Sequence, residues 1–185
     1  LNKEIHEDFL IKLKNRLKKM RIGSGLKDCD IGPLISKQAL EKVENHMQDA
    51  LDKGAKIEIG GKLHKPNSLL FEPTILTSIK QNMLVFKNEN FSPIVPILIF
   101  ENDKEAVEMA NNTEYGLASY FFTTNPRRIW SLVDDLEYGM FGINSGKIST
   151  YLNPFGGVKQ SGIGREGSLQ TLEPFLETKF VNWNF

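Results

Sequence analysis

Short apolar segments of strand length alternate with helical patterns between residues 94 and 144. Residues 94–100 form a continuous apolar run, which is typical of a strand buried on both faces. Residues 117–123 and 140–144 predict two further strands, and helices separate all three. Such connections place parallel strands side by side through right-handed crossovers. We therefore expect an α/β fold with a mostly parallel sheet and flanking helices.

Capping residues mark where several helices are expected to begin. Ser36 precedes a helical repeat of apolar residues, and its hydroxyl suits the N-cap position. Asn125 followed by Pro126 predicts another helix, with proline at its first position. We expect the apolar residues of this helix, including Trp130, to be buried. Residues 1–20 predict a further amphipathic helix, whose basic face is interpreted as a solvated surface.

Composition excludes several classes of protein. The chain has 185 residues, 40% of them hydrophobic, which is enough to form the buried core of one domain or slightly more than one domain. Lys plus Arg equals Asp plus Glu at 23 each, so a nucleic-acid partner is not expected. No apolar run reaches the roughly 18 residues of a membrane span. The charged N-terminal residues do not resemble a signal peptide, which favours a cytoplasmic location. The chain begins with Leu1 and not with methionine, which suggests a piece of a longer protein.

The chemically reactive residues are few. The single cysteine, Cys29, cannot form an internal disulfide, and it lies between Asp28 and Asp30. Their negative charges oppose thiolate formation, so we interpret Cys29 as a structural thiol and not a nucleophile. The three histidines have no spacing typical of a metal site, and none is expected.

A glycine-rich segment begins near residue 145 and lacks periodic apolar patterning, which is typical of an irregular segment that lines a site. Gly162, Gly164 and Gly167 match the G-x-G-x-x-G pattern of dinucleotide-binding loops. That pattern binds phosphate only after a buried strand and at the start of a long helix. The context here differs, so we do not predict a phosphate loop.

Two segments resemble elements of one family. The sequence Glu-Asn-Phe-Ser-Pro at residues 89–93 resembles the E-x-F-G-P element of the aldehyde dehydrogenases. Residues 153–167 resemble their long P-F-G-G-x-K-x-S-G-x-G-R-E signature. Residues 31–35, 71–76 and 113–118 are also similar to family segments, in the expected order. The resemblance covers essentially the whole chain.

The resemblance implies oxidation of a small aldehyde. In this family a Cys thiolate attacks the aldehyde, hydride leaves for NAD or NADP, and water activated by a Glu hydrolyses the thioester. Glu89 matches the carboxylate that holds the nicotinamide ribose hydroxyls, and Phe91 matches the aromatic residue beside it. From the residues alone, without the resemblance, Glu89 is interpreted as a solvated loop carboxylate.

The substrate side rests on two further residues. Phe155 matches an aromatic residue that lines the aldehyde entrance. Residues 142–149 resemble the G-I-N-T-G-x-I-S stretch of the succinate-semialdehyde dehydrogenases, a branch of the family. Ser149 then matches the hydroxyl that helps to bind the distal carboxylate of the substrate. The alternative for Ser149 is an ordinary loop serine.

The resemblance also implies what this chain lacks. The family's nucleophilic Cys, its general-base Glu and its dinucleotide-binding half would precede Leu1, and Ser92 replaces a glycine of the E-x-F-G-P element. We therefore expect no catalytic residue here and no turnover without a missing N-terminal half. Residues 1–174 are expected to be the C-terminal part of the catalytic domain, and residues 175–185 a strand that forms a homo-oligomer. The alternative is a non-catalytic remnant or assembly module of the same fold.

Overall fold

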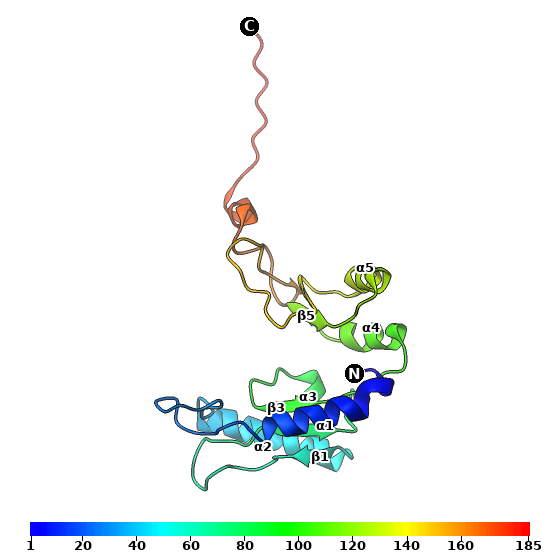
Figure 1. Cartoon of the computed structure of the whole chain (residues 1–185). Coiled ribbons are helices and arrows are strands. Elements are labelled where there is room, and N and C mark those ends of the chain that lie inside the picture. The colour runs from blue at the N-terminus through cyan, green and yellow to red at the C-terminus, as the bar shows by residue number, and fades with distance from the viewer. The chain divides into compact units, whose positions relative to one another are not determined.

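A computed structural model describes residues 1–185, and its contacts divide the chain into two units, Leu1–Asn102 and Asp103–Phe185 (Figure 1). Unit 1 contains a 3-10 helix at Lys3–Ile5, α1 (His6–Leu17), α2 (Lys37–Asp52), β1 (Lys56–Ile59), β2 (Thr74–Thr77), α3 (Leu84–Lys87) and β3 (Ile94–Pro96). Unit 2 contains α4 (Asp103–Asn111), β4 (Tyr115–Gly116), β5 (Ala118–Phe121), α5 (Pro126–Asp135), β6 (Met140–Ile143), β7 (Val158–Lys159) and a 3-10 helix at Leu169–Phe175. None of these helices combines the length and the apolar character needed to cross a lipid bilayer.

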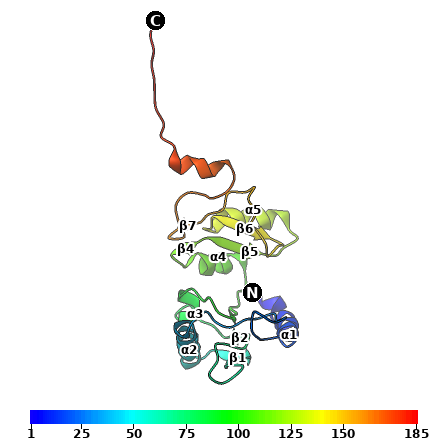
Figure 2. The same cartoon turned by 90° about the vertical axis from the view of Figure 1, so that its left-hand side faces the viewer.

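Unit 1 is a small sheet covered by helices on both faces. Its strands are ordered β1-β2-β3, with β1 antiparallel to β2 and β2 parallel to β3. Successive side chains of a strand point to opposite faces. Accordingly, Ile75 packs in a cluster with Leu10 of α1, whereas Leu76 packs in a cluster with Val43 and Met47 of α2. The two helices therefore lie on opposite sides of the sheet, as Figure 2 shows.

Unit 2 has two short two-stranded sheets. β5 and β6 are parallel, with Ala118 opposite Met140. β4 and β7 are antiparallel, with Tyr115 opposite Lys159. Sequence reasoning did not find the β4 and β7 pair, because each strand has two residues and no apolar periodicity to reveal it.

The expected caps are confirmed. The Ser36 hydroxyl accepts a hydrogen bond from the Ala39 N–H at 3.1 Å. The Asn125 side chain accepts from the N–H groups of Arg127 at 3.0 Å and Arg128 at 3.3 Å. The expected burial of Trp130 is wrong, since 70% of this residue is exposed. The reason is that α5 packs along one side only and has no buried residue.

The mixed α/β content agrees with the predicted class, but a single, mostly parallel sheet is not found. Three small sheets contain two parallel and two antiparallel strand pairs. The apolar run at 94–100 is a strand only at its first three residues, and Val95 and Ile99 are 38% and 43% exposed. Residues 176–185 form no helix or strand in this chain and are all exposed. A terminal strand that pairs with another subunit, and a boundary at 174/175, stay predictions.

A buried histidine on α2 makes the stability of unit 1 sensitive to acid. Only 3% of His46 is exposed, and its Nδ1 atom has no hydrogen-bond partner. Burial lowers the pKa of His46, and the charge of Lys42 adds to this effect against the opposing effect of Asp49. The folded state therefore binds this proton less readily than the unfolded state does. The free energy of unfolding falls as the pH drops below about 6.5, the ordinary pKa of histidine.

We expect the His46→Leu variant to lose less thermal stability on acidification than the wild type, because it has no imidazole to protonate on unfolding. The measurement is the change in Tm between about pH 7.5 and about pH 5.5. His64→Leu is the matched control, since the His64 side chain is 36% exposed, and it should keep the wild-type change. Equal changes in Tm for His46→Leu and the wild type would contradict the assignment.

Candidate active site

Glu89 and Phe91 lie in the loop that joins α3 to β3 in unit 1. Both side chains are exposed, Phe91 to 85%. Before the loop, Met83 and Val85 are 0% and 4% exposed and anchor α3 in the core. The structure thus presents the Glu89 carboxylate and the Phe91 ring at the surface of an anchored loop.

The loop accommodates Ser92 without strain. The Ser92 hydroxyl donates to Oδ1 of Asn90, and Nδ2 of Asn90 donates to the carbonyl oxygen of Ile94 at 3.3 Å. Ser92 is not among the residues with positive φ, so its backbone does not require glycine. The Thr74 N–H also donates to the carbonyl oxygen of Pro93 at 2.8 Å. Asn90 thus ties the loop to β3 and Ser92 holds Asn90, while the carboxylate of Glu89 stays exposed.

Ser149 and Phe155 belong to unit 2, where the structure brings their segments together. Ile148, Thr150 and Phe155 line one cavity of about 160 Å³. Ser149 is exposed and lies between two of these residues. Sequence reasoning did not identify Ile148 and Thr150 as cavity residues. The only sequence feature that could have indicated them was their position on either side of Ser149.

The segment that carries Ser149 starts from a fixed turn at the end of β6. Asn144 has a φ of 54°, a conformation that asparagine tolerates better than most residues. Its side chain accepts from the Thr123 N–H and donates to the Thr123 carbonyl oxygen, both at 2.9 Å. Its own N–H donates to the carbonyl oxygen of Phe121 at 3.0 Å. The position of the chain is therefore set five residues before Ser149.

The glycines of the signature allow main chains to pack against one another. A Cβ atom on Gly139 would lie 2.1 Å from the carbonyl oxygen of Gly156, and one on Gly156 would lie 2.7 Å from that of Gly164. One on Gly157 would lie 2.5 Å from Cβ of Ser161. These glycines therefore let neighbouring segments of the backbone approach more closely than any side chain at these positions would allow.

The G-x-G-x-x-G match lies in a different setting from a dinucleotide loop. Gly162, Gly164 and Gly167 all have positive φ. The preceding strand, β7, has two residues, and a 3-10 helix at Leu169–Phe175 follows. These three glycines therefore serve turns of the chain and not the start of a long helix.

Two cations of the signature hold its loop in place: Lys159 bonds to other parts of unit 2, and Arg165 bonds within the loop. Lys159 donates from Nζ to the carbonyl oxygens of Asn111 at 3.0 Å and Thr113 at 3.1 Å, and it also pairs with Glu137. Arg165 donates to the carbonyl oxygen of Gly157 at 2.8 Å. Sequence reasoning placed these residues in the signature but did not predict their contacts. They support the backbone next to Phe155.

Cys29 lies in a turn of unit 1. Its Sγ donates to the carbonyl oxygen of Ser24 at 3.3 Å. The flanking Asp28 and Asp30 both pair with Arg21, which lowers the pKa of Asp30. The flanking carboxylates are thus used in a structural ion-pair cluster, in keeping with a structural thiol.

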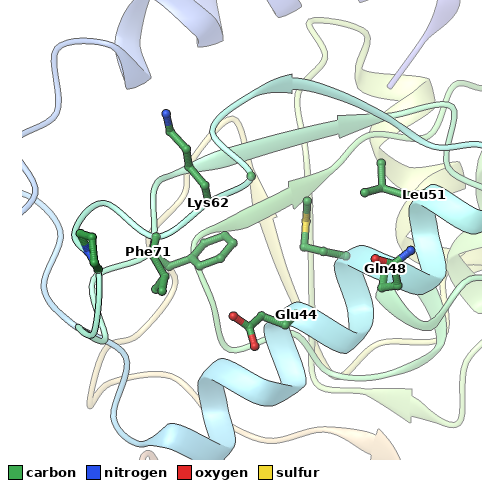
Figure 3. Close-up of a pocket in the computed structure, with 9 residues that line it drawn as sticks. Glu44, Gln48, Leu51, Lys62 and Phe71 are labelled. Atoms are coloured by element: carbon green, nitrogen blue, oxygen red, sulfur yellow. The ribbon is translucent and has the colours of Figure 1, made fainter.

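A further cavity, of about 490 Å³, lies in unit 1 between α2 and the segment at residues 61–71 (Figure 3). Glu44, Gln48 and Leu51 of α2 contribute to its lining, and the Phe71 ring points toward this helix. Its lining residues are separate from Glu89 and Phe91. This cavity is therefore not part of the candidate site.

Comparison with known proteins decides which family these loops belong to. The model of the aldehyde dehydrogenase family matches residues 1–181. The chain belongs to the aldehyde dehydrogenase family. The resemblance inferred from the loop at 89–93 and the signature at 153–167 is thereby confirmed.

Three similar proteins place the chain within the aldehyde dehydrogenases. It is 46% identical over 178 residues to a glutarate-semialdehyde dehydrogenase of Pseudomonas aeruginosa, covering 96% of this chain and 37% of the relative. It is 45% identical over 179 residues to the mitochondrial succinate-semialdehyde dehydrogenase of Rattus norvegicus, covering 96% of this chain and 34% of the relative. A crystal structure of an E. coli NADP-dependent enzyme matches with a TM-score of 0.92 and 43% identity, covering 95% of this chain and 37% of that one. The chain spans about a third of the length of these aldehyde dehydrogenases.

Proposed function

We propose that the chain is the C-terminal part of an NAD(P)-dependent aldehyde dehydrogenase that oxidises succinate semialdehyde to succinate. The observation that carries the proposal is the family match over residues 1–181, within which the exposed loops present Glu89, Phe91, Ser149 and Phe155. An N-terminal part supplies the nucleophilic Cys and the general-base Glu. The complete enzyme is this chain joined to such a part.

Glu89 and Phe91 fit the cofactor's nicotinamide ribose. The carboxylate of Glu89 would accept hydrogen bonds from two neighbouring ribose hydroxyls, and the exposed ring of Phe91 would pack beside them. Bound NAD or NADP supplies the acceptor for the hydride of the thiohemiacetal. The residues of this chain thus orient the cofactor, which lowers the entropic part of the barrier to hydride transfer. Hydrolysis of the resulting thioester by water releases the acid and restores the thiolate.

Ser149 and Phe155 serve the aldehyde. Glutarate semialdehyde and succinate semialdehyde, named for the two curated relatives, differ in chain length but share a distal carboxylate. A hydroxyl donor such as that of Ser149 suits this carboxylate, and Phe155 lines the aldehyde entrance. Succinate semialdehyde is preferred in the proposal because residues 142–149 resemble the corresponding stretch of that branch.

The C-terminal residues are proposed to join copies of the enzyme. Residues 1–174 belong to the catalytic domain, and residues 175–185 form a strand that joins copies of the enzyme in a cytoplasmic homo-oligomer. Six exposed apolar residues support an interface there: Phe175, Leu176, Phe180, Val181, Trp183 and Phe185. The same residues favour the second candidate function, a non-catalytic assembly module. The two differ in whether the complete protein turns over aldehyde.

Ser149→Ala tests the substrate assignment. In the complete enzyme we expect kcat/KM for succinate semialdehyde to fall about tenfold, because a hydrogen bond to a charged group contributes roughly 1.5 to 3 kcal/mol. Butyraldehyde has no carboxylate, so its kcat/KM should change little, and the ratio between the two substrates is the quantity to measure.

Ser131→Ala on α5 is the matched control, since the Ser131 hydroxyl donates to Asp135 of the same helix at 3.2 Å. It should leave the ratio unchanged. Equal losses for both substrates in Ser149→Ala would show that Ser149 supports the loop and does not bind the carboxylate.

A further inference from the structure

Asp49 of α2 caps the short helix that leads to Glu89. Its Oδ2 atom accepts a hydrogen bond from the N–H of Leu84, the first residue of α3, at 2.7 Å. Met83, at the N-cap position of α3, provides no side-chain hydrogen bond to the helix. The first N–H groups of a helix lack acceptors within the helix, so Asp49 supplies one from 35 residues away.

A lysine holds the capping carboxylate in place. Lys53 donates from Nζ to Oδ1 of Asp49 at 2.5 Å and to the carbonyl oxygen of Asn82 at 2.9 Å. Lys80 donates in turn to the carbonyl oxygen of Lys53 at 3.0 Å. The hydrogen bonds from Lys53 and from the Leu84 N–H lower the pKa of Asp49, so its carboxylate is ionised at neutral pH. The C-terminal end of α2 and residues 80–84 are thereby clamped together.

One helical turn connects the clamped residues 80–84 to Glu89. The Asn88 N–H donates to the carbonyl oxygen of Leu84 at 2.9 Å, and Glu89 is the next residue. Met83 and Val85 fix the same turn through the core. The start of the Glu89 loop is thus set by α2, and its end is set by the hydrogen bond between Thr74 and Pro93.

We infer that Asp49 is a positioning residue for Glu89: by holding the start of α3 it sets where the Glu89 carboxylate meets the cofactor ribose. The inference rests on the proposed function of Glu89. Asp49 itself contacts neither cofactor nor substrate. Its effect on cofactor binding therefore depends on the presence of the Glu89 carboxylate.

The test measures cofactor binding to the complete enzyme by titration calorimetry with NAD⁺ and with NADP⁺, without turnover. Asp49→Asn keeps the shape of the side chain but weakens its bonds to Lys53 and Leu84. We expect Glu89→Gln to raise Kd about tenfold and Asp49→Asn about fivefold, since bonds to charged groups are the stronger ones. The double variant should bind within about twofold of Glu89→Gln alone, because coupled residues are not additive.

Two further variants separate positioning from folding. Asp52→Asn makes the same chemical change on the same helix, where Asp52 accepts from Gln48 at 2.7 Å, and it should leave Kd unchanged. Lys53→Met keeps Asp49 but removes the cation that holds it, so we expect Lys53→Met also to raise Kd. It takes the place of Asp49→Asn if that variant does not fold. Amide hydrogen exchange at Leu84 should accelerate in both Asp49→Asn and Lys53→Met.

The outcomes distinguish the two ideas. Unchanged cofactor binding in Glu89→Gln contradicts the proposed function of Glu89. Two results would overturn only the positioning role of Asp49, provided that Glu89→Gln does weaken cofactor binding. One is wild-type binding in Asp49→Asn, and the other is losses that add in the double variant.

Discussion

The chain on its own is expected to form no NADH or NADPH from succinate semialdehyde or from any other aldehyde. The proposed chemistry needs a Cys thiolate in the active site, and the chain contains one cysteine, Cys29. This thiol donates to the carbonyl oxygen of Ser24 in a turn flanked by aspartates. Loss of a nucleophile lowers kcat by roughly six orders of magnitude in well-studied cases. The measurement is the absorbance of the reduced nicotinamide over time.

The complete enzyme is the positive control in this assay, and it should tolerate Cys29→Ser without loss of activity. Reduced nicotinamide formed by the chain alone, and abolished by Cys29→Ser, would contradict both the mechanism and the structural role given to Cys29.

Gly139→Ala is expected to destabilise unit 2 severely. The added Cβ atom would lie 2.1 Å from the carbonyl oxygen of Gly156 and 2.8 Å from Cα of Gly157. Both are main-chain atoms, so a change of rotamer cannot relieve the clash. We expect the free energy of unfolding to fall by about 3 kcal/mol, the upper end for overpacked sites. For a unit of this size the Tm should fall by more than about 10 °C, measured by calorimetry.

Gly146→Ala provides the matched control, because a Cβ atom there would meet nothing within 4 Å. This variant should stay within about 0.5 kcal/mol of the wild type. A similar Tm for both glycine variants would show that the main-chain contact between Gly139 and Gly156 is looser than the structure indicates.

The parts of the fold that depend on local contacts were predictable from the sequence. The caps at Ser36 and Asn125 act over two or three residues. The exposure of Trp130 was not predictable from helical spacing, because spacing identifies an apolar stripe but not what covers it. The pairing of Tyr115 with Lys159 joins residues far apart in the sequence, and no local pattern encodes it.

The candidate site shows the same division. Glu89, Phe91, Ser149 and Phe155 were identified from motifs that are contiguous in the sequence. The cavity that Phe155 shares with Ile148 and Thr150 depends on how the chain turns after β6, and the motif does not describe this turn. Asp49 was missed because its partner, Leu84, is 35 residues away in the sequence. The hydrogen bond is made by the main-chain N–H of Leu84, which almost any residue type at this position would also provide.

The close contacts of Gly139 and of two signature glycines bear on how the aldehyde preference of the proposed enzyme is best redesigned. Gly139, Gly156 and Gly157 lie within van der Waals reach of other main-chain or side-chain atoms, so mutational libraries should leave them fixed. The segment at residues 149–152 is exposed and projects from the fixed turn at Asn144. Under the role proposed for Ser149, randomising this segment alone would sample new pockets for the far end of the aldehyde while the scaffold behind it keeps its shape.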